Sequence, residues 1–243
     1  MVMTLRLYQA PTTWIFFDLI NQAHILVVAP SGGGKTYACK QILADIIQQS
    51  NHNSPVKLII CDYKGDNDFN QLDGFAYCYR YQRVKDGFLT FYKRLTDRQS
   101  GSDISRNPIY LYFDEWASFI LSVASADKKE ADKLKMKMTE ILQLARSFNM
   151  HVICSLQRAE ASYFINGSRD NFPIRIGLSR LSDESRRQLF PDIPKELYEP
   201  MKQGQGWVQT DDKPYPFQII VPQMNTDEVD SIISSALGGL NQK

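Results

Sequence analysis

The chain has 243 residues, of which 43% are apolar and 23% are charged, and its formal net charge is +1 at pH 7. This length and composition support one large buried core and exclude an intrinsically disordered chain. A charge so close to zero excludes attraction of a polyanion by the molecule as a whole, so a nucleic-acid partner would need a local basic surface.

The apolar stretches of the chain are too short for a membrane-spanning helix. Residues 14–20 and 25–29 fall well below the roughly 20 apolar residues that such a helix needs, and the first residues do not resemble a secretion signal. The four cysteines lack metal-ligand spacing, so we expect reduced, buried thiols. We therefore expect a cytoplasmic protein with one domain over residues 1–243, including a lead-in over residues 1–22.

From residue 24 onward, short β-branched runs alternate with longer segments of helical periodicity. We expect strands at residues 25–28, 56–61, 76–79, 109–113, 151–155 and 174–178. We expect long helices at residues 37–49, 84–98 and 128–148. This alternation predicts an α/β fold with a mostly parallel sheet flanked by helices, and it predicts ligands at the carboxyl ends of the strands.

The last 40 residues have a different pattern. Glycines and prolines flank two short β-like runs at residues 207–209 and 217–221, which predicts a hairpin added to the edge of the sheet. A final helix is expected over residues 227–237, with Thr226 as its N-cap and Gly238 just past its end. Residues 203–243 are thus predicted to form a C-terminal hairpin and helix.

A phosphate-binding loop is predicted between the first buried strand and the first long helix. The segment reads Ala29-Pro30-Ser31-Gly32-Gly33-Gly34-Lys35-Thr36, which matches GxxxxGK[ST] except that Ala29 replaces the first glycine. Glycines let backbone N–H groups converge on phosphate oxygens, Lys35 would reach the β and γ phosphates, and Thr36 would bind Mg²⁺. These residues predict ATP and Mg²⁺ as cofactors, in preference to an incidental glycine-rich turn.

Two carboxylates follow the apolar strand at residues 109–113. Asp114 would support the Mg²⁺ shell across from Thr36, and Glu115 would orient and polarise the attacking water beside the γ phosphate. The alternative is that the two acidic residues only open the next helix.

Two polar residues near the next strand are further catalytic candidates. Gln157 follows the strand and would contact both the γ phosphate and the water, unless it only faces solvent. Arg146 precedes the strand at the end of a helix, where the helix dipole alone favours a cation. Its sharper role is an arginine finger inserted into the site of a neighbouring subunit.

These motifs resemble the FtsK/HerA superfamily, and most closely the FtsK-type motor domain. The resemblance runs from Asp18 to Leu237. The segments that carry it are Asp18-Leu19 with residues 24–27, Cys61-Asp62-Tyr63-Lys64-Gly65, residues 145–153 and 155–158, residues 171–176 with Asp183, Ser185 and Arg186, Gly204-Gln205-Gly206, and residues 227–229. Departures from the family pattern are Ala145, Asn149, Leu156 and a longer segment at residues 119–133.

The resemblance implies a RecA-like P-loop core that hydrolyses ATP to ADP and phosphate. It also implies a homo-oligomer, a hexameric ring with active sites shared between subunits, and double-stranded DNA in its central channel. The family's membrane segments and DNA-reading domain are not found in the sequence, so we expect a partner protein to provide membrane anchoring or DNA recognition.

The implied function is a hexameric double-stranded DNA translocase, stimulated by DNA, for conjugation, mobile-element transfer or genome packaging. The DNA-binding candidates are Lys128, Lys129, Lys133, Arg158 and Arg169. Because Glu130 and Asp132 alternate with the lysines, an ordinary solvated helix face is the alternative for them. Two other functions stay open: the ATPase motor of a specialised protein secretion system, and a nucleotide-gated assembly module.

Overall fold

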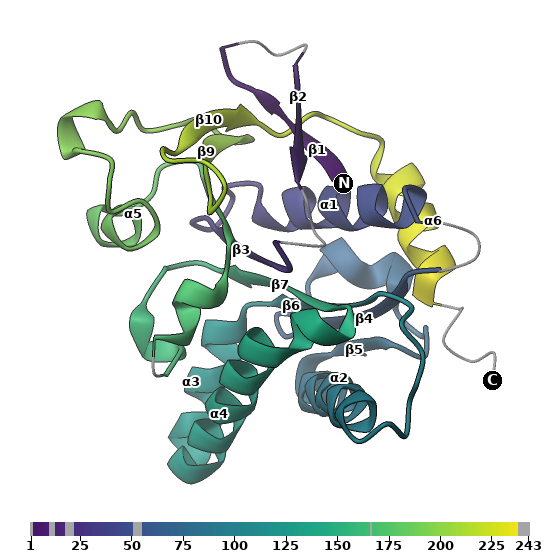
Figure 1. Cartoon of the computed structure of the whole chain (residues 1–243). Coiled ribbons are helices and arrows are strands. Elements are labelled where there is room, and N and C mark those ends of the chain that lie inside the picture. Colours follow the sequence, from purple (N-terminus) through teal and green to yellow (C-terminus); the bar gives the residue numbers. More distant parts are fainter. Residues whose placement is uncertain (1, 10–12, 18–21, 51–54, 166, 238–243) are drawn as a thin grey trace.

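The computed structural model describes residues 2–9, 13–17, 22–50, 55–165 and 167–237 (Figure 1). Asp18, Leu19 and Gly238, which the sequence assigned to the lead-in and to the end of the last helix, lie outside the described residues. Among the described residues, no helix is both long and apolar enough to cross a membrane.

The described strands form one ten-stranded sheet in the order β2-β1-β10-β9-β8-β3-β7-β6-β4-β5. The strands are β1 (Val2–Leu7), β2 (Trp14–Phe17), β3 (His24–Val28), β4 (Lys57–Asp62), β5 (Cys78–Arg80), β6 (Ile109–Asp114), β7 (Met150–Leu156), β8 (Ile174–Leu178), β9 (Gln205–Thr210) and β10 (Phe217–Ile220). The pairings from β8 through β5 are parallel, and those from β8 to β2 are antiparallel. The predicted α/β fold with a mostly parallel sheet is confirmed.

Helices cover both faces of the sheet (Figure 1). They are α1 (Lys35–Gln48), α2 (Val84–Gln99), α3 (Trp116–Ala126), α4 (Lys128–Leu144), α5 (Asp183–Leu189) and α6 (Thr226–Leu237). Helices α1 and α6 pack together on one face, and α2, α3 and α4 lie on the other. Strand β3 contributes to both cores, because Ile25 and Val27 point to the first face whereas Leu26 and Val28 point to the second.

The structure differs from the sequence-based prediction at both ends of the chain. Part of the lead-in forms the β1–β2 hairpin, and β1 pairs with β10, so the sheet continues beyond the predicted C-terminal hairpin. Thr226 is not the N-cap of the last helix. The Oδ1 of Asn225 accepts the Asp227 amide at 3.0 Å, so the cap lies one residue earlier.

The predicted helix over residues 128–148 ends earlier than expected. Helix α4 stops at Leu144 and continues as a 3₁₀ turn, η3 (Ala145–Phe148), which Asn149 ends in the left-handed conformation at φ 54°. The helical hairpin of α3 and α4 occupies the segment that is longer than the family pattern.

Two buried histidines lie near the amino ends of β3 and β7. The Nδ1 of His24 accepts the Val152 amide at 3.0 Å, and the His151 ring stacks on Tyr110 with centroids 4.5 Å apart. Burial is the main cause that lowers the pKa of His24 to about 3 and that of His151 to about 4. Both rings are therefore neutral in the folded chain at pH 6.

Acidification from pH 7.5 to pH 5.5 should lower the free energy of unfolding by about 2–3 kcal/mol. In this window the unfolded chain gains a proton on each histidine, whereas the folded chain does not, so protonation favours unfolding. Urea unfolding at pH 7.5, 6.5 and 5.5 measures the effect, and a His151→Gln variant should show about half of it. An unchanged free energy of unfolding across these pH values would show that the two histidines are not held neutral in the folded chain.

Candidate active site

The predicted phosphate-binding loop connects β3 to the first turn of α1. Gly32 and Gly34 adopt φ values of +74° and +87°, which side chains other than glycine rarely adopt. A Cβ on Gly33 would lie 3.0 Å from both the Ala29 Cβ and the Pro30 carbonyl oxygen. Ala29 itself is fully buried and donates its amide to the Leu156 carbonyl at 3.1 Å, so a methyl group fits where the motif usually has glycine.

The acidic pair lies at the carboxyl end of β6, against Lys35. The Lys35 Nζ is 2.5 Å from the Glu115 Oε1 and 3.7 Å from the Asp114 Oδ1. Glu115 makes no capping hydrogen bond to α3, although it directly precedes that helix at φ 59°. The side chains of all three residues are at least 90% buried. The carboxylates therefore face the phosphate-binding loop, and helix capping does not account for Glu115.

Electrostatics keep Lys35 charged. Burial alone would lower the pKa of Lys35, but the Asp114 and Glu115 carboxylates outweigh it, and the pKa is raised. The cation is thus available to phosphate oxygens at any physiological pH.

Hydroxyl groups from two neighbouring strands hold the carboxylate of Asp114. Tyr112 and Ser155 both donate to its Oδ1, at 2.7 Å and 2.6 Å. Gln157, just after β7, donates its Nε2 to the Glu115 Oε1 at 3.2 Å. The parallel register of β6 and β7 brings these side chains together, as expected for the carboxyl ends of neighbouring strands.

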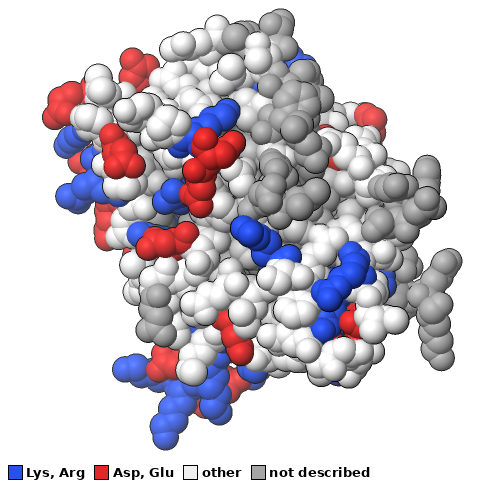
Figure 2. Space-filling model, viewed as in Figure 1, with Lys and Arg blue, Asp and Glu red and all other residues white. Residues whose placement is uncertain are grey.

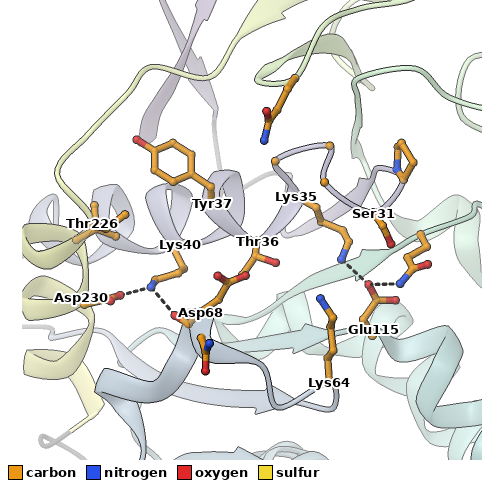
Figure 3. A pocket seen from close by; sticks show the side chains of 18 of the residues that line it. Ser31, Lys35, Thr36, Tyr37, Lys40, Lys64, Asp68, Glu115, Thr226 and Asp230 are labelled. Carbon is orange, nitrogen blue, oxygen red and sulfur yellow. Dashed lines mark hydrogen bonds and ion pairs between the residues drawn. The ribbon is translucent and has the colours of Figure 1, made fainter.

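A cavity of about 460 Å³ opens in front of these groups (Figure 3). Its walls include the loop residues 30–34, Lys35, Thr36, Glu115 and Gln157. A hydroxyl and a carboxylate, from Thr36 and Asp114, are ligand types that Mg²⁺ prefers alongside phosphate oxygens. The residues present therefore fit a nucleoside triphosphate with Mg²⁺.

Lys64, which lies in the segment Cys61-Asp62-Tyr63-Lys64-Gly65 that resembles the family, is a further cation at this cavity. It points toward Lys35 and Glu115 from the loop after β4 (Figure 3). Its Nζ is 2.6 Å from the Asp66 Oδ2, and this hydrogen bond raises its pKa. Its loop is fixed by a buried ion pair, because the Arg80 Nε donates to the Asp62 Oδ2 at 2.9 Å. Lys64 follows the end of β4 by two residues, and this position could have marked it as a site residue in the sequence.

Two curated proteins are similar to this chain in sequence, although no family model matches it. The Ftsk domain-containing protein YdcQ of Bacillus subtilis (strain 168) is 25% identical over an alignment of 208 residues, which covers 80% of this chain and 42% of YdcQ. The DNA translocase FtsK of Borreliella burgdorferi is 25% identical over an alignment of 199 residues, which covers 71% of this chain and 24% of that protein. Both similarities support an assignment to the FtsK-like superfamily. It spans less than half the length of both relatives.

Solved structures of P-loop ATPases share the fold. The conjugation coupling protein TcpA of pCW3, solved with ATPγS, has a TM-score of 0.71 at 17% identity, over 96% of this chain and 70% of TcpA. The Type VII secretion ATPase EccC of Thermomonospora curvata has a TM-score of 0.67 at 17% identity, over 98% of this chain and 31% of EccC.

In this FtsK-like chain, Arg146 lies far from the phosphate-binding loop. It is exposed in η3, before the start of β7, whereas the loop and Gln157 lie beyond the end of that strand. Seven strand residues rise about 20 Å. Arg146 lines a different cavity of about 460 Å³, together with His24 and Asp211. Within one chain, the structure does not bring Arg146 to the other candidate catalytic residues.

The DNA-binding candidates of this FtsK-like chain fall into two groups. Lys128 and Lys129 are exposed at the start of α4, and charged side chains gather at the tip of the α3–α4 hairpin (Figure 2). Arg158 is exposed after β7. Arg169 donates to the Ala159 carbonyl at 3.4 Å and to the Gln188 Oε1, so its guanidinium is engaged in holding its loop.

Proposed function

We propose that the chain is an ATP-hydrolysing motor subunit of a hexameric ring that moves double-stranded DNA. The observation that carries the proposal is the cluster of Lys35, Glu115 and Gln157 at the phosphate-binding loop, with Glu115 2.5 Å from Lys35. Sequence similarity to the DNA translocase FtsK of Borreliella burgdorferi supports DNA as the cargo.

Each residue of the site has a proposed role. ATP supplies the γ phosphate that is transferred to water, and Mg²⁺ neutralises the charge that develops on it. Lys35 and the loop amides bind the phosphates, while Thr36 and Asp114 hold the metal. Glu115 accepts a proton from the attacking water.

The ion pair between Lys35 and Glu115 makes these roles interdependent. Phosphate oxygens compete with the Glu115 Oε1 for the Lys35 ammonium, because both are anions that seek the same buried cation. Release from Lys35 gives Glu115 a free oxygen for water, and Gln157 remains within hydrogen-bond reach to orient that oxygen. Phosphate binding thereby prepares the base.

The ring is proposed because Arg146 lies at the opposite end of β7 from the site of its own subunit. A neighbouring subunit that presents its Arg146 to this site would complete the charge stabilisation. A partner protein that anchors the ring or reads DNA sequence belongs to the same proposal.

Duplex DNA should stimulate the ATPase activity of the purified chain, and the double variant Lys128→Glu/Lys129→Glu should weaken that stimulation. Charge reversal removes phosphate contacts, so the salt dependence of DNA binding should also become shallower. Phosphate release, measured with and without long duplex DNA at low salt, provides the test.

Lys93→Glu is the matched control, because Lys93 is an exposed lysine on α2, with a side chain 73% accessible. Equal loss of stimulation in the control would contradict a specific role for Lys128 and Lys129. An ATPase activity that no DNA affects would contradict the DNA translocase and favour a protein cargo instead.

A further inference from the structure

A buried tyrosine lies two residues before the carboxylate that we assign to the metal. Tyr112 is fully buried on the face of β6 that packs against α1. Side chains two positions apart lie on the same face of a strand, so the tyrosine can reach Asp114. Its hydroxyl donates to the Asp114 Oδ1 at 2.7 Å. A buried hydroxyl needs a hydrogen-bond partner, and here that partner belongs to the candidate site.

The two hydroxyl groups that contact Asp114 donate to the same oxygen atom. Ser155, on the neighbouring strand β7, donates to Oδ1 at 2.6 Å. The Glu115 amide in turn donates to the Ser155 hydroxyl at 3.4 Å. A carboxylate can accept on both of its oxygens, so Oδ2 is left for a cation or for water bound to one. The contacts therefore hold Asp114 in an orientation that suits a metal ligand.

Lys35 is a cation that could take the same oxygen. Its Nζ is 3.7 Å from the Asp114 Oδ1, which is too long for a direct hydrogen bond. If the Tyr112 hydroxyl were removed, Oδ1 would lose a donor in a buried place, where an unmade hydrogen bond is costly. A closer approach of Asp114 to Lys35 would replace the lost donor. The same movement would turn the carboxylate away from the metal.

We propose that Tyr112 is a positioning residue for Mg²⁺ binding, and that its hydroxyl holds Asp114 away from Lys35. This inference rests on the proposed ATPase function and deepens it. Tyr112 is not among the residues that line the cavity, so it acts on the metal through Asp114.

The ring of Tyr112 is itself fixed by the residues around it. It packs against Phe69 of the 3₁₀ helix η1 (Asn67–Leu72), with ring centroids 5.7 Å apart. It also belongs to the same buried core as Cys39, which lies one helical turn after Lys35 on α1. A residue that positions a site needs a side chain locked by packing, and Tyr112 meets this requirement.

Tyr110 shows that burial alone does not give a tyrosine this contact. It lies on the same face of β6 and belongs to the same core, and it is 6% exposed. Its ring stacks on His151, near the amino ends of the strands. Of the two tyrosines, only Tyr112 donates to a carboxylate of the candidate site. Tyr110 therefore provides a matched control for the loss of a buried hydroxyl.

Calorimetric titration of the full chain with ATPγS, in EDTA and at a series of Mg²⁺ concentrations, tests the proposal. Mg²⁺ should strengthen ATPγS binding to the parent. Tyr112→Phe should raise the Mg²⁺ concentration that gives half of this effect at least about fivefold, because Asp114 loses a hydrogen bond to a charged group. The affinity in EDTA should stay within about twofold, since Lys35 already has an anionic partner, Glu115, in the parent.

Tyr110→Phe should follow the parent at every Mg²⁺ concentration. Ser155→Ala provides a second route if Tyr112→Phe does not fold, because it removes the other donor to the same oxygen. It should also raise the Mg²⁺ requirement. An unchanged requirement in the variant that folds would overturn the proposal.

Two further results would overturn the positioning role and leave the proposed ATPase function standing. One is an equal rise of the Mg²⁺ requirement in Tyr110→Phe. The other is a loss of ATPγS affinity in EDTA as large as the loss with Mg²⁺, which would indicate general distortion of the site. If Mg²⁺ did not affect the parent, the metal role of Asp114 would be wrong, and with it this inference. A parent that binds no ATPγS under any of these conditions would overturn the proposed ATPase function itself.

Discussion

Glu115→Gln should lower the rate of ATP hydrolysis at least about 100-fold, because removal of a positioned general base typically costs this much. The amide keeps the shape of the side chain but cannot accept the proton of the attacking water. ATP binding should persist, since Lys35 loses a competing carboxylate 2.5 Å away. Phosphate release and titration of an ATP analogue measure the two properties separately.

Glu140→Gln is the matched control, because Glu140 is an exposed glutamate on α4 that accepts a hydrogen bond from Tyr92 at 2.5 Å. It should hydrolyse ATP like the parent. If Glu115→Gln were as active as the parent, another group would have to be the base.

Arg146→Ala should lower ATP hydrolysis at least about 1000-fold if its guanidinium completes the site of a neighbouring subunit. Lys35→Ala should be equally inactive, because it removes the phosphate-binding cation from the site of its own subunit. An equal mixture of the two variants should recover activity at about one quarter of the interfaces of a randomly mixed ring, since each variant supplies what the other lacks. Phosphate release from the remixed subunits is the readout.

A mixture of Lys35→Ala with Glu115→Gln is the control for this complementation. Lys35 and Glu115 of each site come from the same subunit, so no single site in the mixture has both residues intact. Activity should therefore stay low. Without recovery in the Arg146→Ala mixture, although both variants assemble, Arg146 would not be a residue that acts across subunits.

Much of the site could be predicted from the sequence because its parts are local. Lys35 and Thr36 follow a glycine-rich turn between a strand and a helix, and Asp114 and Glu115 end a strand that is apolar along its length. Parallel strands then bring their carboxyl ends to one edge of the sheet without further information. The neighbourhood of Gln157 and Glu115 follows from the same geometry.

Other features depend on contacts between distant segments, which a single sequence does not display. The β1–β2 hairpin pairs with β10, more than 200 residues later, so its role in the sheet is a property of the folded chain. Arg169 was a DNA-binding candidate in the sequence, but in the structure it donates to Gln188, which is 19 residues away.

The left-handed backbone of Glu115 has a consequence for how this position can change. A residue with a Cβ at φ 59° costs roughly 1–2 kcal/mol relative to relaxed backbone, and glycine would avoid that cost. Glycine would also remove the carboxylate that faces Lys35. Glycine at position 115 would therefore stabilise the folded chain but abolish the proposed general base. Backbone conformation and catalysis favour different residues at this position.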